Sequence, residues 1–425
     1  MNNYLNTSKL GELGKVSMCK RILKHQTSEN GDIPFYKIST FGGVSKTFIS
    51  NKLYKSFREK YSYPKIGDIL ISAAGTIGKT VIFDGEPSYF QDSNIVWIAN
   101  NENKVINGFL YYYYQTKPWI ATKGSTIKRL YNDNIRNLTI NYPEIHIQNE
   151  ITKVLNNLDT KINVNNQINK ELETASKLLY NYWFVQFDFP NENGKPHKSS
   201  GGKMVYNEAL KRDIPERWES GVIKDWIGND KSGDWGKESE QGNYVQRVSC
   251  IRGADINGLN GKGEVKSPTR YILEKNSHKI LEIGDLIVEI SGGSPTQSTG
   301  RLAFIIDKTL ERFNDPLICS NFCKAVTLKE EKALYNFVYL WNRLYDAGVL
   351  FGWEGKTSGI KNLLFDSFVS NYKVVLPDSK LMEVFYEKIH PIHSQIQKNL
   401  EQNHKLAELR DWLLPMLMNG QVRVN

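Results

Sequence analysis

Two long segments of the chain carry apolar side chains at alternating spacings of four and three residues. They cover residues 147–184 and 381–418. This spacing repeats every seven residues, which is typical of α-helices that pack side by side along one seam. Each segment is therefore predicted to form one long helix, about 57 Å in length at 1.5 Å per residue. Pro391 is expected to kink the second helix or to delay its start.

The predicted seams contain asparagine as well as aliphatic residues. The first seam consists of Ile151, Leu155, Leu158, Ile162, Asn165, Asn169, Leu172, Ser176 and Leu179. The second consists of Phe385, Ile389, Ile392, Ile396, Asn399, Asn403, Leu406, Arg410 and Leu413. An amide in a seam lowers stability but fixes the register, because a buried amide needs a specific hydrogen-bonding partner.

The remaining sequence alternates short β-rich runs with turn residues. The runs in the first half are GDILIS, KTVIFDGEP and NIVWIANNEN, and those in the second half are GDLIVEI, GRLAFIIDK and CKAVTLK. Gly, Asp, Asn and Pro separate them, as expected of strands joined by turns. Short helices are predicted at residues 108–116 and 334–345. Each half is therefore predicted to contain an α+β globule with a curved, mainly antiparallel sheet.

The two halves are copies of one unit. IGDILIS at 66–72 recurs as IGDLIVE at 283–289, and STIKRL at 125–130 recurs as SGIKNL at 358–363. The long segments also align with each other, at an offset of 234 residues. A recurrence of this kind indicates a duplicated structural unit. The order along the chain is globule, helix, globule, helix.

The repeat and the local composition set the predicted boundaries. A polar, Gly- and Ser-containing stretch, NENGKPHKSSGG, indicates a flexible linker. The predicted parts are a first globule at 1–146, a first helix at 147–190, a linker at 191–212, a second globule at 213–377, and a second helix with a tail at 378–425.

Composition narrows the class of protein. The 425 residues fit two or three domains. No window holds 18 consecutive apolar residues, so no transmembrane helix is expected, and the N-terminus does not have the pattern of a signal peptide. Four cysteines suit a reducing cytoplasm better than a disulfide scaffold. The net charge of +9 is compatible with a polyanionic partner but does not establish one.

Three short motifs are better explained by structure than by chemistry. AAGTIGKT at 73–80 matches a phosphate-binding loop, but that loop must open a helix, and the β-branched KTVIF predicts a hairpin turn instead. Cys319 and Cys323 are predicted to be buried free thiols, because a zinc site needs about four ligands. His390 and His393 are predicted to lie on a solvated helix face.

The sequence lacks a recognisable catalytic motif. Methyl transfer to a base would need a Gly-rich cofactor loop and an Asn/Asp-Pro-Pro-aromatic motif beside a flipped base. The nearest string, residues 314–317, lacks the second proline and the aromatic residue. Glu354 and Lys356 could belong to a nuclease, but no acidic partner precedes them at a recognisable spacing. The chain is therefore predicted not to be an enzyme.

Basic and polar side chains in the loops could instead bind DNA. Lys and Arg neutralise phosphates, while Ser and Thr can bond to phosphates or base edges. Both copies contain Ser-x-Ile-Lys, which marks this loop, although Ile127 and Ile360 could equally anchor a core and the polar residues could be ordinary solvated ones. The candidates are Lys79, Lys123, Ser125, Thr126, Lys128, Arg129, Arg301, Lys356, Thr357, Ser358 and Lys361. Residues 91–94 fit equally well as caps at the start of a strand or as polar readers.

Several strings occur in a family-specific order. They are LGELG, YPKIGDILISAAGTIGK, FQDSNIVWI, IPERW and AELRDWLLPMLMNGQV, and they accompany the duplicated globule–helix unit. In these respects nearly the whole chain resembles the DNA specificity subunit of Type I restriction-modification systems. The resemblance implies two target recognition domains that read the two parts of a split, asymmetric DNA site. It also implies that the two helices form an antiparallel coiled-coil spacer.

The resemblance also implies partners. They are double-stranded DNA, two modification (methyltransferase) subunits and restriction subunits in the cytoplasm, with no membrane. The helix seams would serve as the spacer and partner-binding segment. S-adenosylmethionine, ATP and magnesium would belong to the partner subunits, with no cofactor in this chain. Two alternatives remain: a duplicated adaptor that binds only protein, and a stand-alone DNA methyltransferase, which the missing motifs disfavour.

Overall fold

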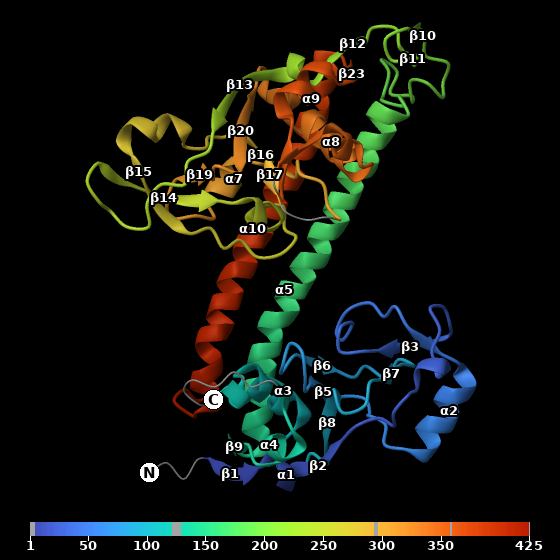
Figure 1. Ribbon diagram of the computed structural model, residues 1–425, viewed down its shortest axis with the longest axis vertical. Helices are drawn as coiled ribbons and strands as arrows, with labels where there is room; N and C mark the ends of the chain where they lie inside the picture. The colour runs from blue at the N-terminus through green and yellow to red at the C-terminus, as the bar shows by residue number, and fades with distance from the viewer. Residues whose placement is uncertain (1–4, 121–128, 293–295, 358, 425) are drawn as a thin grey trace. The chain divides into compact units, whose positions relative to one another are not determined.

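The computed structural model describes residues 5–120, 129–292, 296–357 and 359–424 (Figure 1). The chain divides into two compact units. Unit 1 contains residues 1–162 and 405–425, and unit 2 contains residues 163–404. Each unit therefore comprises one globule together with parts of both long helices. Within the described residues, no helix combines the length and the apolar character needed to cross a bilayer.

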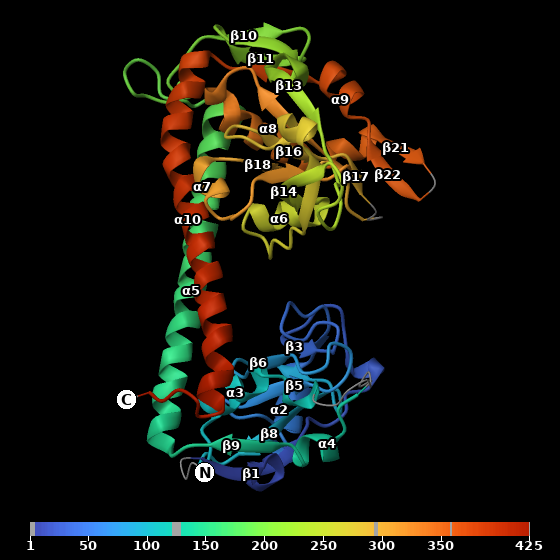
Figure 2. The same cartoon turned by 90° about the vertical axis from the view of Figure 1, so that its left-hand side faces the viewer.

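The two long helices form as predicted. They are α5 (Ile145–Tyr180), which continues into a π-helical turn (Asn181–Val185), and α10 (Ser379–Met418) (Figure 2). Because α10 begins at Ser379, well before Pro391, the proline does not delay the start of the helix.

Polar side chains join α5 and α10 within each unit. In unit 2, Asn165 Nδ2 donates a hydrogen bond to Asn403 Oδ1 at 2.8 Å, and Asn399 Nδ2 donates to Asn169 Oδ1 at 2.8 Å. A later residue of α5 thus meets an earlier residue of α10, so the helices are antiparallel. Because a buried amide is costly without a partner, these pairs fix the register of the helices.

The described residues of unit 1 form three groups of paired strands. A four-stranded antiparallel sheet has the order β2 (Gly14–Ser17), β8 (Ile95–Asn100), β5 (Ile69–Ser72) and β6 (Thr80–Ile82). A second sheet has the order β4 (Phe48–Ile49), β3 (Ile33–Tyr36) and β7 (Tyr89–Phe90), with β3 and β7 parallel. The third pair is β1 (Asn6–Lys9) with β9 (Thr139–Tyr142). The shorter helices are α1 (Leu10–Leu13), α2 (Asn51–Lys60), α3 (Asn107–Gln115) and α4 (Asn132–Arg136).

Unit 2 repeats this arrangement. Its four-stranded antiparallel sheet has the order β13 (Ile227–Ser232), β20 (Cys323–Leu328), β16 (Leu286–Glu289) and β18 (Leu302–Phe304). A second sheet has the order β15 (Thr269–Leu273), β14 (Tyr244–Ile251) and β19 (Leu317–Cys319), with β14 and β19 parallel. The pair β12 (Glu219–Val222) and β23 (Lys373–Leu376) corresponds to β1 and β9. The shorter helices are α6 (Ile256–Leu259), α7 (Asp307–Leu310), α8 (Leu334–Asp346) and α9 (Phe365–Asn371).

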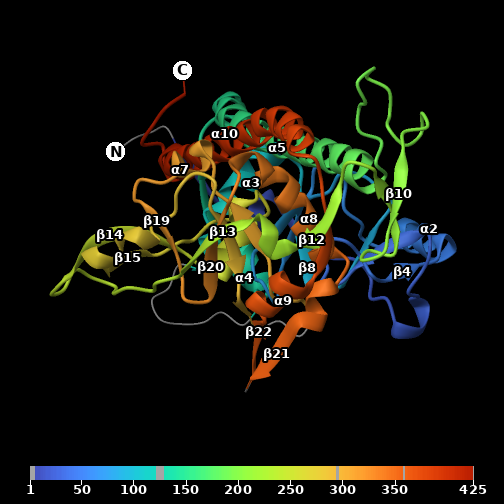
Figure 3. The ribbon, with the colours of Figure 1, turned by 90° about the horizontal axis from the view of Figure 1, so that it is seen from above.

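The predicted fold class is therefore confirmed: the chain contains two repeated α+β globules with mainly antiparallel sheets. Unit 2 also has a hairpin of β21 (Glu354–Thr357) and β22 (Ile360–Leu363), which pairs with β17 (Ser291–Gly292) and projects from the body of the unit (Figure 3). The predicted helices at 108–116 and 334–345 correspond to α3 and α8.

The predicted linker at 191–212 contains a short strand. Strand β10 (Met204–Asn207) in this stretch pairs with β11 (Arg212–Pro215). Asp188 anchors the preceding turn, because its carboxylate accepts hydrogen bonds from Ser199 N at 2.7 Å and Ser199 Oγ at 2.6 Å. Composition identified the turn residues but missed the short strand between them.

The prediction that His390 and His393 lie on a solvated face was wrong. His393 is buried, and its Nε2 lies 2.8 Å from the Tyr339 hydroxyl of α8. His390 Nδ1 lies 3.0 Å from the Tyr335 hydroxyl. Burial lowers the pKa of His393 to about 3. The aromatic face of α8 covers this part of α10, so the helix end becomes part of the core of unit 2.

Candidate nucleic-acid interface

The motif that matches a phosphate-binding loop joins two antiparallel strands, β5 and β6. Ser72 N donates to Lys79 O at 2.9 Å, and Gly78 N donates back to Ser72 O at 2.9 Å. Gly78 has a φ of +78°, and a Cβ there would lie 2.1 Å from Cζ2 of Trp119, so only glycine fits. The predicted hairpin turn is confirmed, and the loop lacks the helix that would present its amides to phosphate.

Three chain segments meet at Ala73 in unit 1. Ala73 N donates to Asn94 O at 2.8 Å, and Ala73 O accepts from Leu130 N at 2.8 Å. The hairpin loop, residues 91–94 and the end of STIKRL are thereby joined. We call this three-way meeting the loop junction of unit 1.

Unit 2 contains the same junction around Ile290. Ile290 N donates to Phe322 O at 2.8 Å, and Ile290 O accepts from Leu363 N at 2.8 Å. Ile290 corresponds to Ala73, and Leu363 corresponds to Leu130, in the repeat. In each unit, an equivalent backbone hydrogen bond therefore joins the residue directly after the first recurring string to the last residue of the second.

Two basic side chains at the junction of unit 1, Lys79 and Arg129, bond to backbone carbonyls. Lys79 is exposed, and its Nζ donates to Phe41 O at 2.6 Å. Arg129 Nη2 donates to Ser93 O at 2.7 Å. Neither side chain forms a salt bridge with any residue that the structure describes. Both cations are anchored to backbone carbonyls but keep their net charge, as a phosphate-binding group must.

The charged side chains at the junction of unit 2 are neutralised. The Arg301 guanidinium donates to both carboxylate oxygens of Glu289, at 2.9 and 2.6 Å, and these hydrogen bonds raise the pKa of Arg301. Lys361 Nζ lies 3.1 Å from Glu354, whose other oxygen accepts from Thr299 N at 2.8 Å. Arg301 and Lys361 therefore hold the junction together, and their geometry does not support the predicted role at phosphates.

The remaining candidates for DNA binding cannot be placed by the described residues. Lys123, Ser125, Thr126, Lys128 and Ser358 lie outside the described residues, as do the side chains of Lys356 and Thr357. Their role in DNA binding stays a prediction.

The surroundings of Ile360 and of residues 91–94 distinguish between the alternatives for each. Ile360 is 47% exposed, so it does not anchor a core. Gln91 Oε1 accepts a hydrogen bond from Ile38 N at 3.0 Å, and Asp92 lies 3.2 Å from the Arg21 guanidinium. These contacts favour the interpretation that residues 91–94 cap the start of β8.

The predicted helix seams run along α5 and α10, and their residues are buried or partly buried. Asn165, Asn169 and Asn399 are buried there, and so are Leu155, Ile389 and Ile396. Leu158, Ile162, Leu172, Leu179, Asn403, Leu406 and Leu413 are partly buried. The buried asparagines pair the two helices across the seam, and the role of the seams in binding partner subunits stays a prediction.

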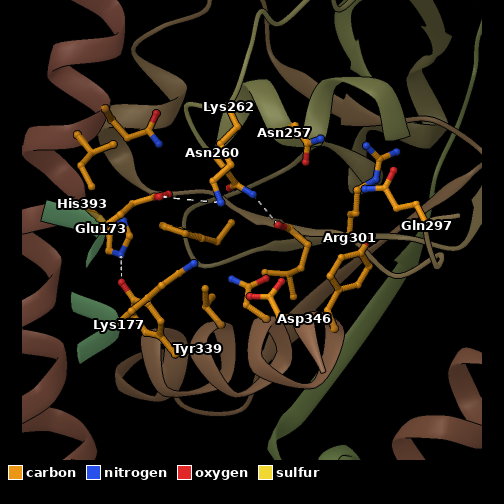
Figure 4. Close-up of a pocket in the computed structure, with 17 residues that line it drawn as sticks. Glu173, Lys177, Asn257, Asn260, Lys262, Gln297, Arg301, Tyr339, Asp346 and His393 are labelled. Carbon is orange, nitrogen blue, oxygen red and sulfur yellow. Dashed lines mark hydrogen bonds and ion pairs between the residues drawn. The ribbon is translucent and has the colours of Figure 1, made fainter. Parts of the chain in front are cut away.

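Unit 2 also contains a polar cavity and two neighbouring buried thiols. The cavity in unit 2 lies beside Arg301, Tyr339 and His393 (Figure 4) and has a volume of about 120 Å³. Ligand pockets measure about 300–1,000 Å³, so this cavity is too small for a nucleotide or S-adenosylmethionine. Cys319 and Cys323 are buried, and burial raises the pKa of Cys323 to about 12. The described residues contain no cluster of His, Cys, Asp or Glu that could hold a metal ion.

Known proteins similar to this chain share one description. Residues 3–174 match the family model of the Type I restriction modification DNA specificity domain. The chain is 52% identical over 177 residues to a type I restriction enzyme specificity subunit, S.HindORF215P, from Haemophilus influenzae, and this match spans 41% of the chain and 45% of that protein. It is 25% identical over 415 residues to the MjaIX specificity subunit of Methanocaldococcus jannaschii, a match that spans 93% of the chain and 88% of that protein.

A solved structure extends the likeness to the fold. The chain superimposes on the Type-I restriction-modification system S subunit from M. genitalium with a TM-score of 0.59 and 14% identity. The match covers 98% of this chain and 97% of that one. At this identity the likeness concerns the fold alone.

Proposed function

We propose that this chain, which belongs to the type I restriction-modification specificity subunits, reads a split, asymmetric DNA target and docks the modification and restriction subunits of its complex. The loop junction that occurs once in each unit carries this proposal. The same backbone hydrogen bonds hold different side chains at the two junctions. Two loop clusters that share a construction but differ in chemistry suit two half-sites of different sequence.

The long helices would connect the two readers. Helix α5 is continuous and contributes residues to both units. Its pairing with α10 is fixed by the buried asparagines. We infer that the pair acts as the spacer between half-sites, because a helix with a fixed register has a fixed rise per residue.

The exposed faces of the helices support docking of two copies of one partner. Leu178 of α5, in unit 2, is 63% exposed, and Trp412 of α10, in unit 1, is 57% exposed. The two residues are equivalent in the repeat, which aligns the helices at an offset of 234. We call the surfaces around these two residues the docking patches, and their equivalence in the repeat supports two equivalent protein contacts. We assign one modification subunit to each patch.

Chemistry would belong to the partners. A specificity subunit is not the catalytic component of its complex, and S-adenosylmethionine, ATP and magnesium would bind the modification and restriction subunits. The experiment is to sequence the methylome of a host with and without this chain. We expect one bipartite methylated motif that disappears when the chain is deleted. Loss of no motif, in a host that still expresses the modification subunits, would favour the adaptor that binds only protein.

A further inference from the structure

The net charge of the chain is concentrated in one unit. The residues of unit 1 include 24 Lys and Arg against 15 Asp and Glu, whereas those of unit 2 include 31 of each. The whole excess of +9 thus belongs to unit 1. Since phosphate neutralisation supplies most of the sequence-independent affinity for DNA, unit 1 is where that affinity should arise.

Helix α2 presents part of this charge on one face. Lys52, Lys55 and Arg58 occur at every third position and are all exposed. None of them forms a salt bridge with a described residue, and Glu59 is the only acid in the helix. Their charges are therefore not neutralised within the unit.

The opposite face of α2 fixes the helix to the core. Tyr54 is buried, and Leu53 and Phe57 pack against the same core cluster. Ser50 caps the helix, because its side chain accepts a hydrogen bond from Leu53 N at 3.3 Å. The cationic face is therefore presented by a rigidly seated helix and not by a mobile loop.

Arg58 is held in position by aromatic neighbours. Its guanidinium carbon lies 5.4 Å from the centre of the Tyr63 ring, and Nη1 lies 3.4 Å from the Tyr54 hydroxyl. Tyr63 in turn donates to Ser88 O at 2.7 Å. A guanidinium that is already ordered loses less entropy when it binds a phosphate in the bidentate manner.

An open groove adjoins these cations. It is lined by Asn51, Tyr54, Lys55, Arg58 and Glu59 of α2 and by Ile33 and Pro87 opposite, and its volume is about 610 Å³. A space of this size admits a segment of a polyanion as well as a single small ion.

We propose that the Lys52–Lys55–Arg58 face of α2 binds the DNA sugar–phosphate backbone and supplies the salt-dependent, sequence-independent affinity of this specificity subunit. The inference rests on the proposed function. It goes further by assigning different contributions to DNA binding to the two units. Unit 1 supplies most of the electrostatic attraction, and unit 2 binds its half-site without net charge.

The test uses the full chain assembled with its modification subunits and two duplexes, one with the methylated motif and one scrambled. The double variant Lys52→Ala/Lys55→Ala is compared with the wild type by measuring affinity as a function of salt. Two lost phosphate contacts should make the slope of log K against log salt less negative by about 1.8, which is about 60-fold in affinity at 0.1 M salt. Both duplexes should weaken equally, because phosphate contacts carry no sequence information.

A matched control is Lys224→Ala/Lys275→Ala, which removes two exposed lysines from unit 2. Its slope should equal that of the wild type. An unchanged slope in the folded α2 variant, or a loss confined to the motif duplex, would overturn the inference while leaving the proposed function intact. Failure of the wild-type assembly to bind either duplex would overturn both.

Discussion

Lys79 in unit 1 and Arg301 in unit 2 occupy the same place, directly before the second strand of equivalent hairpins. Opposite Lys79 stands Ser72, whereas opposite Arg301 stands Glu289. The charge of Lys79 is therefore left unbalanced by a described acid, whereas the charge of Arg301 is balanced by the Glu289 carboxylate in a largely buried ion pair. The same contrast holds for the units as wholes, with net charges of +9 and zero. A duplicated backbone can thus carry two different electrostatic surfaces.

The largest effect should come from breaking the ion pair. Glu289→Ala leaves the Arg301 guanidinium, 18% exposed, without its partner and should destabilise unit 2 by about 3–5 kcal/mol. The equivalent change in unit 1, Ser72→Ala, removes neutral hydrogen bonds and should cost about 1 kcal/mol. Hydrogen exchange of strands β16 and β5 measures each unit separately. Equal losses of stability in the two variants would show that the Glu289–Arg301 ion pair contributes no more than the neutral hydrogen bonds of Ser72.

The next effect concerns the two proposed docking patches, which are equivalent in the repeat. Leu178→Asp and Trp412→Asp should each weaken the binding of one modification subunit by about 2–4 kcal/mol, because each substitution places a charge in an apolar contact. Native mass spectrometry should show complexes with one modification subunit in each single variant and none in the double variant. Lys170→Asp, on exposed α5 surface, serves as the control and should retain two. A single variant that loses both would mean the patches are not independent.

A smaller effect distinguishes the units by acid sensitivity. Burial lowers the pKa of His393 to about 3, below the value of about 6.5 in the unfolded chain. Between pH 3 and pH 6.5, the unfolded chain binds a proton at His393 that the folded chain does not. The contribution of neutral His393 to folding stability is therefore fully present above pH 6.5. It falls as the pH drops, by up to about 1.4 kcal/mol for each pH unit. Urea unfolding of unit 2 from pH 7 to 4.5 should show this loss, and His393→Gln should remove it. Hydrogen exchange in unit 1, where the described histidines are exposed, should not change when His393 is replaced.

Local patterns predicted the framework of both units. The heptad spacing located α5 and α10 because helix periodicity is visible in the chain itself. The hairpin at 73–80 was recognisable from its β-branched residues. Lys79 and Arg301 were both candidates from the sequence, but their equivalence in the two hairpins became visible only in the fold.

Contacts between distant segments were not predictable in this way. The partner of Arg301 is Glu289, and only the pairing of β16 with β18 brings them together. His393 looked solvated because its cover, Tyr339, comes from another helix. The cationic face of α2 was missed because it lies in residues 31–60, where the copies have diverged. Its signal was the spacing of cations at every third position.

The central claim is that each globule reads one half of the target by itself. It is tested most directly by replacing residues 1–146 with the matching segment of a related specificity subunit and sequencing the methylome of a host that carries the assembled chimera. Each globule has its own core and its own loop junction, so we predict that one half of the bipartite motif changes and the other half stays the same. A chimera that assembles and methylates DNA but changes both halves, or neither, would contradict the account.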